Sequence, residues 1–314
     1  MKVSVIIPVY NSSKYIKKCI DSLISQTLKD AEFLFIDNGS TDDSPLIIKS
    51  YKDERVKYLK TKERGISIAR NYGLEKSIGE TICFVDSDDY VKEDMLEKMY
   101  RKMHDENLDV VICDYNTVDS INYNIVREDK LIQFNNTTLK DTPNLLIDIN
   151  LGPCNKLFKR ELFNGLEFPV GIKYEDFKLV SILFDKANKI GKVNESLCFF
   201  THHANSETTT MDERIFDIFI SFDELLYYFK DKKYIKKSLD SLVILKLTDY
   251  CLLQKYQKNL KLGYKFIDEA FEYIEKNTIN YKSNECFNKM NFFKQLISKN
   301  KFFTKFYCRI YHIS

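Results

Sequence analysis

A regular alternation of short apolar runs and amphipathic stretches over residues 1–113 constrains the fold more than any other feature of this sequence. The apolar runs are rich in β-branched and aromatic residues, as buried strands are, and lie at 3–9, 33–37, 56–59, 81–85 and 110–113. The stretches between them carry apolar side chains at helical spacing and cover 14–26, 44–51, 66–76 and 92–105. Strands that alternate with helices predict an α/β fold with a mostly parallel central sheet flanked by helices.

Polar residues follow three of the predicted strands, at the point where each strand ends. They are Asn11 after the first strand, Asp37 and Asn38 at the second, and Asp86-Ser87-Asp88 after the fourth. Ligands of doubly wound sheets bind beyond the carboxyl ends of the strands. We therefore expect these side chains to share one ligand site.

The Asp86-Ser87-Asp88 turn is the most specific of these clusters. Its two carboxylates are hard oxygen ligands, which suit Mg²⁺ or Mn²⁺ bound together with substrate phosphates. A metal there would offset the charge that develops on a leaving diphosphate. Taken alone, such a pattern is more often an ordinary acidic turn.

Four segments occur in a fixed order along the first half of the chain. They read VIIPVYN at 5–11, FIDNGSTD at 35–42, GISIARNYG at 65–73 and FVDSDD at 84–89. Together they closely resemble the N-terminal half of the family 2 glycosyltransferases, a large inverting family with the GT-A fold. The resemblance covers roughly residues 1–205. It implies metal-assisted transfer of a sugar from a nucleotide-diphosphate donor to an acceptor hydroxyl, and the donor it favours is a UDP-sugar.

The resemblance also implies which residues hold the donor and the metal. The donor-binding residues would be Pro8, Val9, Tyr10, Asn11, Asp37, Asn38, Gly65, Arg70, Asp86 and Ser87. Asp88 would be the main metal ligand, with Asp86 and His203 beside it. Asn38 stands where the family usually has a second aspartate that contacts the pyrimidine, so the choice of uridine stays open. Arg70 has the alternative of being a surface arginine.

Glu175 and Asp176 resemble the Glu-Asp pair found further along the chain in the same family. The resemblance implies that Asp176 is the general base that takes the acceptor hydroxyl proton. We expect the pair to begin a helix, whose dipole would hold the Asp176 carboxylate ionised. The alternative is a helix-terminal charge without a chemical role.

Two further segments resemble the acceptor side of the family. Asn155-Lys156-Leu157-Phe158 resembles an Asn-Lys-Leu-Tyr motif, which would make Lys156 an acceptor or phosphate contact. The alternative is a structural cation, and the chain lacks the tryptophan that often precedes this motif. His202 and His203 precede a Ser-Thr segment, where one imidazole would complete the metal shell or touch the diphosphate. We favour His203 as the metal ligand and His202 on the acceptor or phosphate side.

Composition changes after about residue 205. Residues 206–314 contain no proline and a single glycine, which favours helices. We therefore expect a GT-A domain over 1–205, with the donor site in 1–115 and the acceptor side in 116–205, and a helical region over 206–314. That second region carries a net charge of +5, and 1–205 one of −3.

The stretch 286–314 combines six Lys or Arg with eight aromatic residues and no acidic residue. A basic aromatic helix of this kind can lie on an anionic membrane surface. The alternatives are a last helix that packs on the core and an interface between copies in a homo-oligomer.

The net charge, the length of the apolar runs and the cysteine spacing argue against several classes of protein. A net charge of +2 does not favour nucleic-acid binding, and no apolar run reaches the length of a membrane span. Eight scattered cysteines without metal-like spacing indicate buried thiols in a reducing compartment, and no signal peptide is recognised. We expect a cytoplasmic enzyme, with peripheral contact at the inner face of the membrane as a further hypothesis.

Two other functions remain open. A nucleotidyltransferase shares this kind of sheet and its acidic metal ligands, but the loop after the first strand, 9–13, lacks the glycines expected for a triphosphate. A non-catalytic binding subunit with the same fold is the second alternative, and the intact Asp86, Asp88 and Asp176 argue against it. The acceptor would be a glycan, a polyol phosphate or a lipid-linked precursor of a surface polymer.

Overall fold

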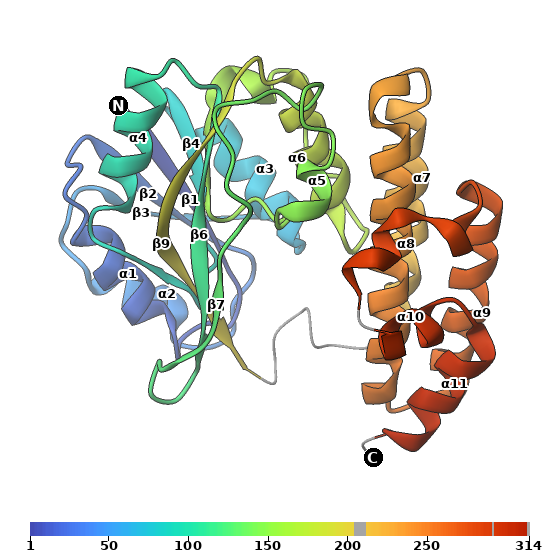
Figure 1. The fold of residues 1–314 in the computed structure, drawn as a ribbon. Coiled ribbons are helices and arrows are strands. Elements are labelled where there is room, and N and C mark those ends of the chain that lie inside the picture. Colours follow the sequence, from blue (N-terminus) through green and yellow to red (C-terminus); the bar gives the residue numbers. More distant parts are fainter. Residues whose placement is uncertain (204–211, 291, 313–314) are drawn as a thin grey trace. The chain divides into compact units, whose positions relative to one another are not determined.

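The computed structural model describes residues 1–203, 212–290 and 292–312. Contacts divide the chain into two compact units. Unit 1 comprises Met1–Thr142, Leu151–Gly171 and Glu175–Ala204, and unit 2 comprises Pro143–Asn150, Ile172–Tyr174 and Asn205–Ser314 (Figure 1). Unit 2 thus includes two short segments that the sequence analysis assigned to the acceptor side of the first domain.

Unit 1 is built on one mixed sheet with the strand order β3-β2-β1-β4-β8-β6-β9-β5. Four strands from the first third of the chain are mutually parallel, which confirms the predicted α/β fold with its mostly parallel sheet. They are β1 (Val3–Val9), β2 (Ala31–Asp37), β3 (Val56–Lys60) and β4 (Thr81–Phe84). Every residue of β1, β2 and β4 is buried, as expected for strands covered on both faces.

The other half of the sheet is partly antiparallel, which the sequence did not predict. Strand β8 (Lys156–Lys159) lies between β4 and β6 (Val110–Asp119) and runs antiparallel to both. Strand β9 (Ile190–His202) is parallel to β6 and spans 13 residues. The short strands β5 (Tyr90–Val91) and β7 (Ile125–Asp129) pair antiparallel with β9 and β6.

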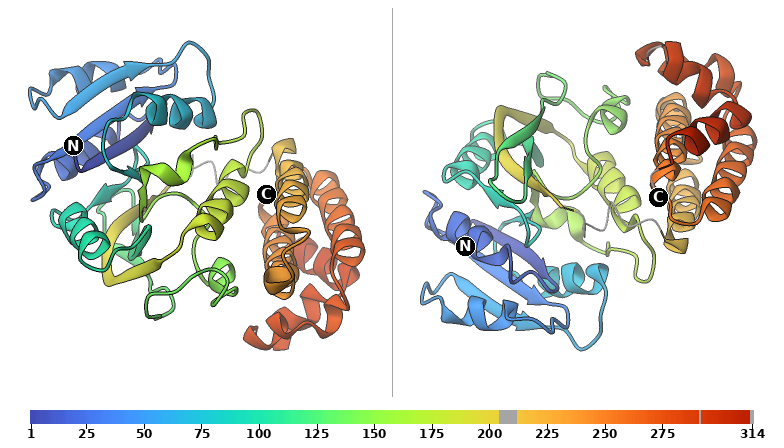
Figure 2. Two further views of the ribbon diagram at one scale, coloured as in Figure 1. Left: turned by 90° about the horizontal axis from the view of Figure 1, so that it is seen from above. Right: turned by 90° about the horizontal axis from the view of Figure 1, so that it is seen from below.

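Helices cover both faces of the sheet (Figures 1 and 2). Alternate residues of a strand point to opposite faces. On one face, α1 (Ile16–Ile24), α2 (Ser44–Ser50) and α4 (Met95–Asp105) share a core with residues such as Val5 and Ile7 of β1. On the other face lie α3 (Ile66–Lys76) and α6 (Glu175–Lys186).

Helix α3 approaches the sheet very closely. A Cβ at Gly73 would collide with the Ile6 side chain of β1, so only glycine fits at this position. Arg70 lies one turn earlier on the same side of the helix, since residues three apart share a face. The close contact therefore holds the Arg70 side chain against the carboxyl edge of the sheet.

Unit 2 is helical, as the loss of glycine and proline predicts. Its helices are α5 (Leu145–Asp148), α7 (Asp217–Phe229), α8 (Lys236–Leu253), α9 (Leu260–Asn277), α10 (Phe292–Ser298) and α11 (Lys301–Ile310). Helix α8 packs against α5, α7, α9 and α11 and buries residues such as Leu242 and Leu247. Among the described residues, none of the helices is both long and apolar enough to cross a membrane.

Candidate active site

The loops after β1, β2 and β4 are joined to one another at the carboxyl edge of the sheet. The backbone N–H of Asn38 donates to the Val9 carbonyl at 2.8 Å, and the N–H of Asn11 donates to the Ser40 hydroxyl at 3.1 Å. The hydroxyls of Ser12 and Ser87 lie 2.6 Å apart. The three predicted clusters therefore form one surface, as expected from parallel strands.

Asp37 and Asn11 hold these loops in place. Asp37 is fully buried and accepts hydrogen bonds from the Tyr58 hydroxyl at 2.7 Å and the Ser40 N–H at 2.9 Å. Although burial opposes it, these bonds lower the pKa of Asp37. Asn11 has a positive φ of 49°, and its Oδ1 accepts from the Thr41 N–H at 2.8 Å. These contacts tie the loops after β1 and β2 to each other and to β3.

The side chains before Asn11 differ in exposure. Pro8 pairs with Ile36 inside the sheet, and Val9 is buried at the end of β1. Tyr10 is 42% exposed, and the guanidinium of Arg64 stacks over its ring at 4.2 Å. Tyr10 is therefore the one of the three that presents a broad apolar face at the strand end.

The orientation of the Asn38 amide is fixed by the backbone of Gly65. The Gly65 N–H donates to Asn38 Oδ1 at 2.9 Å, and the Thr61 hydroxyl lies 3.4 Å from the same oxygen. A backbone N–H only donates, so the amide atom facing it must be the oxygen. Gly65 adopts a φ of 150°, which side-chain-bearing residues rarely adopt. The amide oxygen of Asn38 is consequently committed to the loop that carries Gly65.

Arg70 is buried and links the acidic turn to helix α6. Its Nη1 lies 2.6 Å from Glu175 Oε1, and its Nη2 lies 3.5 Å from Asp86 Oδ1. Burial lowers the pKa of Arg70, but the charges of Asp86 and Glu175 outweigh it and raise that pKa above its ordinary value. The alternative of a surface arginine is therefore wrong, because the side chain is only 4% exposed.

Asp176 follows Glu175 in the first turn of α6, as predicted. Burial and the neighbouring charge of Glu175 together raise the pKa of Asp176 to about 7, although the Arg70 cation opposes this rise. The expectation that the helix dipole holds this carboxylate ionised is thus corrected. The cost of desolvation exceeds the dipole's contribution, which is modest and confined to the first turn.

Asp88 and His203 meet although they are 115 residues apart in sequence. Asp88 Oδ2 and His203 Nε2 are separated by 2.8 Å, and the imidazole stacks on the ring of Tyr15 at 4.8 Å. Burial and the Asp86 charge raise the pKa of Asp88, although the bond to His203 opposes this rise. A cation bound nearby would reduce the repulsion between the Asp86 and Asp88 carboxylates.

The pair fits part of a metal shell. Two ligand atoms at about 2.1 Å from an octahedral ion lie about 3 Å apart, close to the observed separation. His203 Nδ1 is buried without a hydrogen-bond partner in the described part of the chain, and Asp86 is 40% exposed beside Asp88. In the described ranges, no three His, Cys, Asp or Glu side chains are placed together so that they could hold a metal ion. Phosphate oxygens and water would have to supply the other ligands.

Asp89 is a site residue that the sequence analysis did not single out. It is buried, and its Oδ1 accepts from the Thr201 N–H at 2.8 Å, which ties the acidic turn to β9. Burial and the charges of Asp88 and Asp86 raise its pKa well above the ordinary value. Its position as the last residue of the Asp-Ser-Asp-Asp run was the available signal. This bond holds His203, two residues after Thr201, within reach of Asp88.

The sequence profile of the family described as "Glycosyl transferase family 2" matches residues 4–166, more than half of the chain. The chain belongs to glycosyl transferase family 2. The matched stretch contains all three strand-end loops and Arg70.

Relatives from bacteria agree with this assignment. Glycosyltransferase GlyA of Streptococcus pneumoniae is 33% identical over 207 residues, which is 62% of this chain but only 30% of that relative's length. Glycosyltransferase GlyG of the same organism is 31% identical over 217 residues, covering 65% of this chain and 72% of GlyG.

Solved structures show the same fold over nearly the whole chain. Staphylococcus aureus TarS, residues 1–349, in complex with UDP-GlcNAc, gives a TM-score of 0.75 at 20% identity and covers 99% of this chain and 90% of that one. The mannosyltransferase PcManGT from Pyrobaculum calidifontis, in complex with GDP-Man and Mn²⁺, gives 0.60 at 16% identity, with 98% and 86% covered. These likenesses confirm the predicted GT-A architecture with a helical C-terminal region.

Lys156 and His202, the two residues predicted on the acceptor or phosphate side, differ in exposure. The Lys156 side chain is wholly buried in β8, and its ammonium donates to the Gly152 carbonyl at 2.7 Å and to Asn155 Oδ1 at 2.8 Å. Burial lowers the pKa of Lys156 to about 8. These contacts match the alternative of a structural cation. His202, at the end of β9, is exposed.

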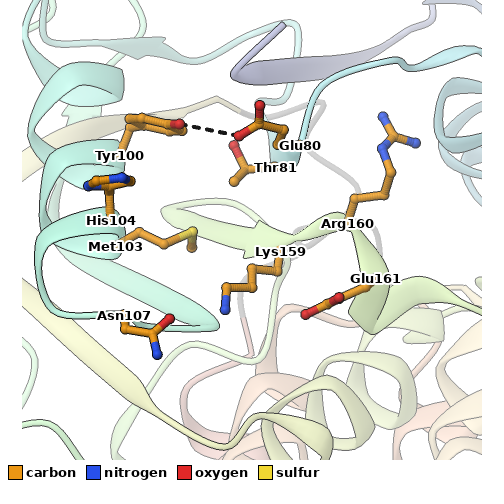
Figure 3. Close-up of a pocket in the computed structure, with 9 residues that line it drawn as sticks. All are labelled: Glu80, Thr81, Tyr100, Met103, His104, Asn107, Lys159, Arg160 and Glu161. Carbon is orange, nitrogen blue, oxygen red and sulfur yellow. Dashed lines mark hydrogen bonds between the residues drawn. The ribbon is translucent and has the colours of Figure 1, made fainter.

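A cavity of about 690 Å³ opens at the opposite edge of the sheet (Figure 3). It is lined by Glu80, Thr81, Tyr100, Met103, His104, Asn107, Lys159, Arg160 and Glu161. Glu80 precedes β4 whereas Asp86 follows it, so about 20 Å of extended chain separates them. Arg160 donates to the Ser77 hydroxyl at 2.9 Å, and Lys159 pairs with Asp109 at 2.7 Å. None of the predicted site residues lines this cavity.

Proposed function

We propose that the protein is an inverting glycosyltransferase that moves a sugar from a nucleoside-diphosphate donor to an acceptor hydroxyl. The observation that carries the proposal is the position of Arg70 between Asp86 and Glu175, at 3.5 and 2.6 Å. It joins the strand-end loops, which suit a nucleotide diphosphate, to the helix that carries the candidate base. Membership of a family of sugar transferases supports the same function.

The proposed donor site comprises the three strand-end loops. Tyr10 provides an apolar surface for the base, and the Asn38 amide nitrogen donates to a carbonyl of the base. A uracil ring offers such carbonyls, so a UDP-sugar is the proposed donor. The Asn38 oxygen already accepts from the Gly65 N–H, so the amide nitrogen is the proposed contact with the base. The UDP-GlcNAc complex of TarS, a structural neighbour, supports this choice.

In the proposed site Asp88, Asp86 and His203 hold a divalent metal ion, Mn²⁺ or Mg²⁺. When bound, the ion offsets the negative charge of the diphosphate leaving group. The 2.8 Å separation of Asp88 and His203 suits neighbouring ligands of one ion. The Mn²⁺ complex of PcManGT supports a metal in this fold.

Asp176 is the proposed general base. The acceptor oxygen forms a bond to the anomeric carbon of the donor while the bond from that carbon to the diphosphate oxygen breaks, and the acceptor's proton passes to the Asp176 carboxylate. A pKa of about 7 lets this group exchange protons near neutral pH. Glu175 is a positioning residue, because its carboxylate is committed to Arg70.

For the acceptor we propose a hydroxyl of a growing surface glycan, a polyol phosphate or a lipid-linked precursor. The similarity of the chain to bacterial glycosyltransferases supports this class. The acceptor would approach from residues 116–205, with 206–314 as a separate helical region.

The test is an incubation of the purified protein with Mn²⁺ and a panel of nucleotide sugars, followed by assay for released nucleoside diphosphate and transferred sugar. We expect release from a UDP-sugar and its loss in Asp88→Ala. Release of pyrophosphate from a nucleoside triphosphate and a sugar phosphate would instead identify a nucleotidyltransferase. Tight binding of a nucleotide sugar without turnover on any acceptor would identify a binding subunit and overturn the proposal.

A further inference from the structure

Helix α11 exposes an aromatic face in unit 2. Its residues Phe302, Phe303, Phe306 and Ile310 are 69%, 40%, 55% and 58% exposed. The opposite side of the helix is docked on the unit, since Thr304 and Cys308 are buried and the Cys308 thiol donates to the Cys251 carbonyl of α8 at 3.3 Å. We call the four exposed side chains the aromatic face.

A row of basic residues runs beside the aromatic face. Lys301, Lys305 and Arg309 are spaced by four, as are Phe302, Phe306 and Ile310, so the two rows are neighbours on the helix surface. Arg309 is exposed. Lys301 and Lys305 also pair with Asp268 of α9, at 3.7 and 2.7 Å, which anchors the first two members of the row to the unit. One side of α11 is thus exposed, and it carries both apolar and cationic side chains.

The preceding helix extends the pattern. Figure 1 shows α10 beside α11, and the two helices pack together. Phe292 at the start of α10 is 81% exposed, and Leu296 one turn later is 44% exposed. The sequence 286–312 contains no acidic residue. The exposed large apolar side chains of α10 and α11 thus follow one another at helical spacing.

We propose that α10 and α11 bind the surface of an anionic lipid bilayer, with the aromatic face among the acyl chains and the basic row against the headgroups. Amphipathic helices lie in the interface in this way, and apolar contact and charge act together. A second copy of the chain fits less well, because a two-fold contact over this face would bring like-charged rows together. The bilayer supplies both the apolar phase and the opposite charge.

The experiment is sedimentation of the full chain with phosphatidylcholine vesicles that contain or lack phosphatidylglycerol, at low and high salt. We expect binding to the anionic vesicles and weaker binding at high salt. The double variant Phe302→Ser/Phe306→Ser should bind these vesicles at least about tenfold less tightly, since it removes two large apolar side chains. Arg309→Glu should bind more weakly and respond less to salt.

A matched control is Ile121→Ser/Val126→Ser, which removes two exposed apolar side chains from unit 1, 81% and 59% exposed, and should bind as the original protein does. Thermal melting of each variant checks that it is folded. Equal binding of the Phe302→Ser/Phe306→Ser variant, or equal binding to neutral and anionic vesicles, would overturn the proposal. A dimer in light scattering that this variant dissociates, without vesicle binding, would identify an interface between copies instead.

Discussion

Arg70 Nη1 and Glu175 Oε1 lie 2.6 Å apart although the residues are 105 positions apart in sequence. Both side chains are buried, and Arg70 also reaches Asp86. The pair therefore fixes the distance between helix α3, helix α6 and the acidic turn. In the proposed enzyme, this ion pair sets the position of the general base, Asp176, relative to the donor.

Replacement of Arg70 by methionine should destabilise the fold. It leaves Glu175 buried without its cation, and breaking a buried ion pair from one side costs about 3–5 kcal/mol. Urea denaturation of the full chain, followed by tyrosine fluorescence, measures the change in the free energy of unfolding. Arg101→Met is the control, because its pair with Glu97 is on the surface and contributes at most about 1 kcal/mol. A similar small change in both variants would contradict the structural role of Arg70.

Replacement of Asp176 by asparagine should leave donor binding intact and lower turnover by about 10²–10⁴-fold, the usual contribution of a general base. Asp185→Asn, in the last turn of the same helix, is the control and should retain turnover. Binding is measured by calorimetry with UDP and Mn²⁺, and turnover by released UDP. Turnover of Asp176→Asn near that of the original protein would assign the base elsewhere.

The rate should depend on pH through the same group. A base acts in its ionised form, and the pKa of Asp176 is raised to about 7, so turnover should rise with pH up to about that value and then level off. A rate that is flat between about pH 5 and 8 would contradict this assignment.

The stability of the fold should change with pH in the opposite direction. A carboxyl whose pKa is raised by folding binds more protons in the native state than in the unfolded chain, between its ordinary pKa and the raised one. The free energy of unfolding should therefore fall as pH rises from about 4 to about 7, and Asp176→Asn should reduce this slope. Denaturation at a series of pH values measures it, and an unchanged slope would contradict the raised pKa.

The parallel half of the sheet could be predicted because its signals are local. Each of β1, β2 and β4 is a short, mostly apolar run, and a polar site residue (Asn11, Asn38 or Asp86) follows each strand within two positions. The strand-end clusters follow from the topology of any such sheet. The fold class and the loops that form the site could therefore be predicted from the sequence alone.

The antiparallel insertion could not be predicted in the same way. Strand β8 has four residues, and its side chain at Lys156 is a buried cation held by the loop before it, which no hydrophobic pattern signals. The pairing of Asp88 with His203 depends on β9 pairing with β6 as far as His202, although the register of the two strands shifts on both sides of Asp114. Both features arise from contacts between distant segments, whose register sequence periodicity does not encode.

The Asn38 amide offers a test of base recognition. If its nitrogen donates to the base, Asn38→Asp replaces this donor by an acceptor, which suits the ring N–H of uracil. The ratio of the affinity for UDP to that for its N3-methyl derivative, which lacks this N–H, should therefore increase by roughly tenfold, the discrimination that one hydrogen bond provides. Asn124→Asp, on the surface of unit 1, is the control. An unchanged ratio would mean that Asn38 does not contact the base.

Removal of the metal ligands should separate metal-dependent from metal-independent donor binding. Asp88→Ala should abolish the gain in UDP affinity that Mn²⁺ produces, because it removes the main ligand and leaves His203 without its partner at 2.8 Å. His203→Ala should weaken the Mn²⁺ effect by about 10- to 100-fold, and Asp94→Ala, away from the acidic turn, should leave it intact. Calorimetric titration of UDP with Mn²⁺ and with EDTA measures each value. If UDP binds Asp88→Ala with the same Mn²⁺ dependence as the original protein, the ion is held elsewhere, and the 2.8 Å contact of Asp88 with His203 serves only to join the acidic turn to β9.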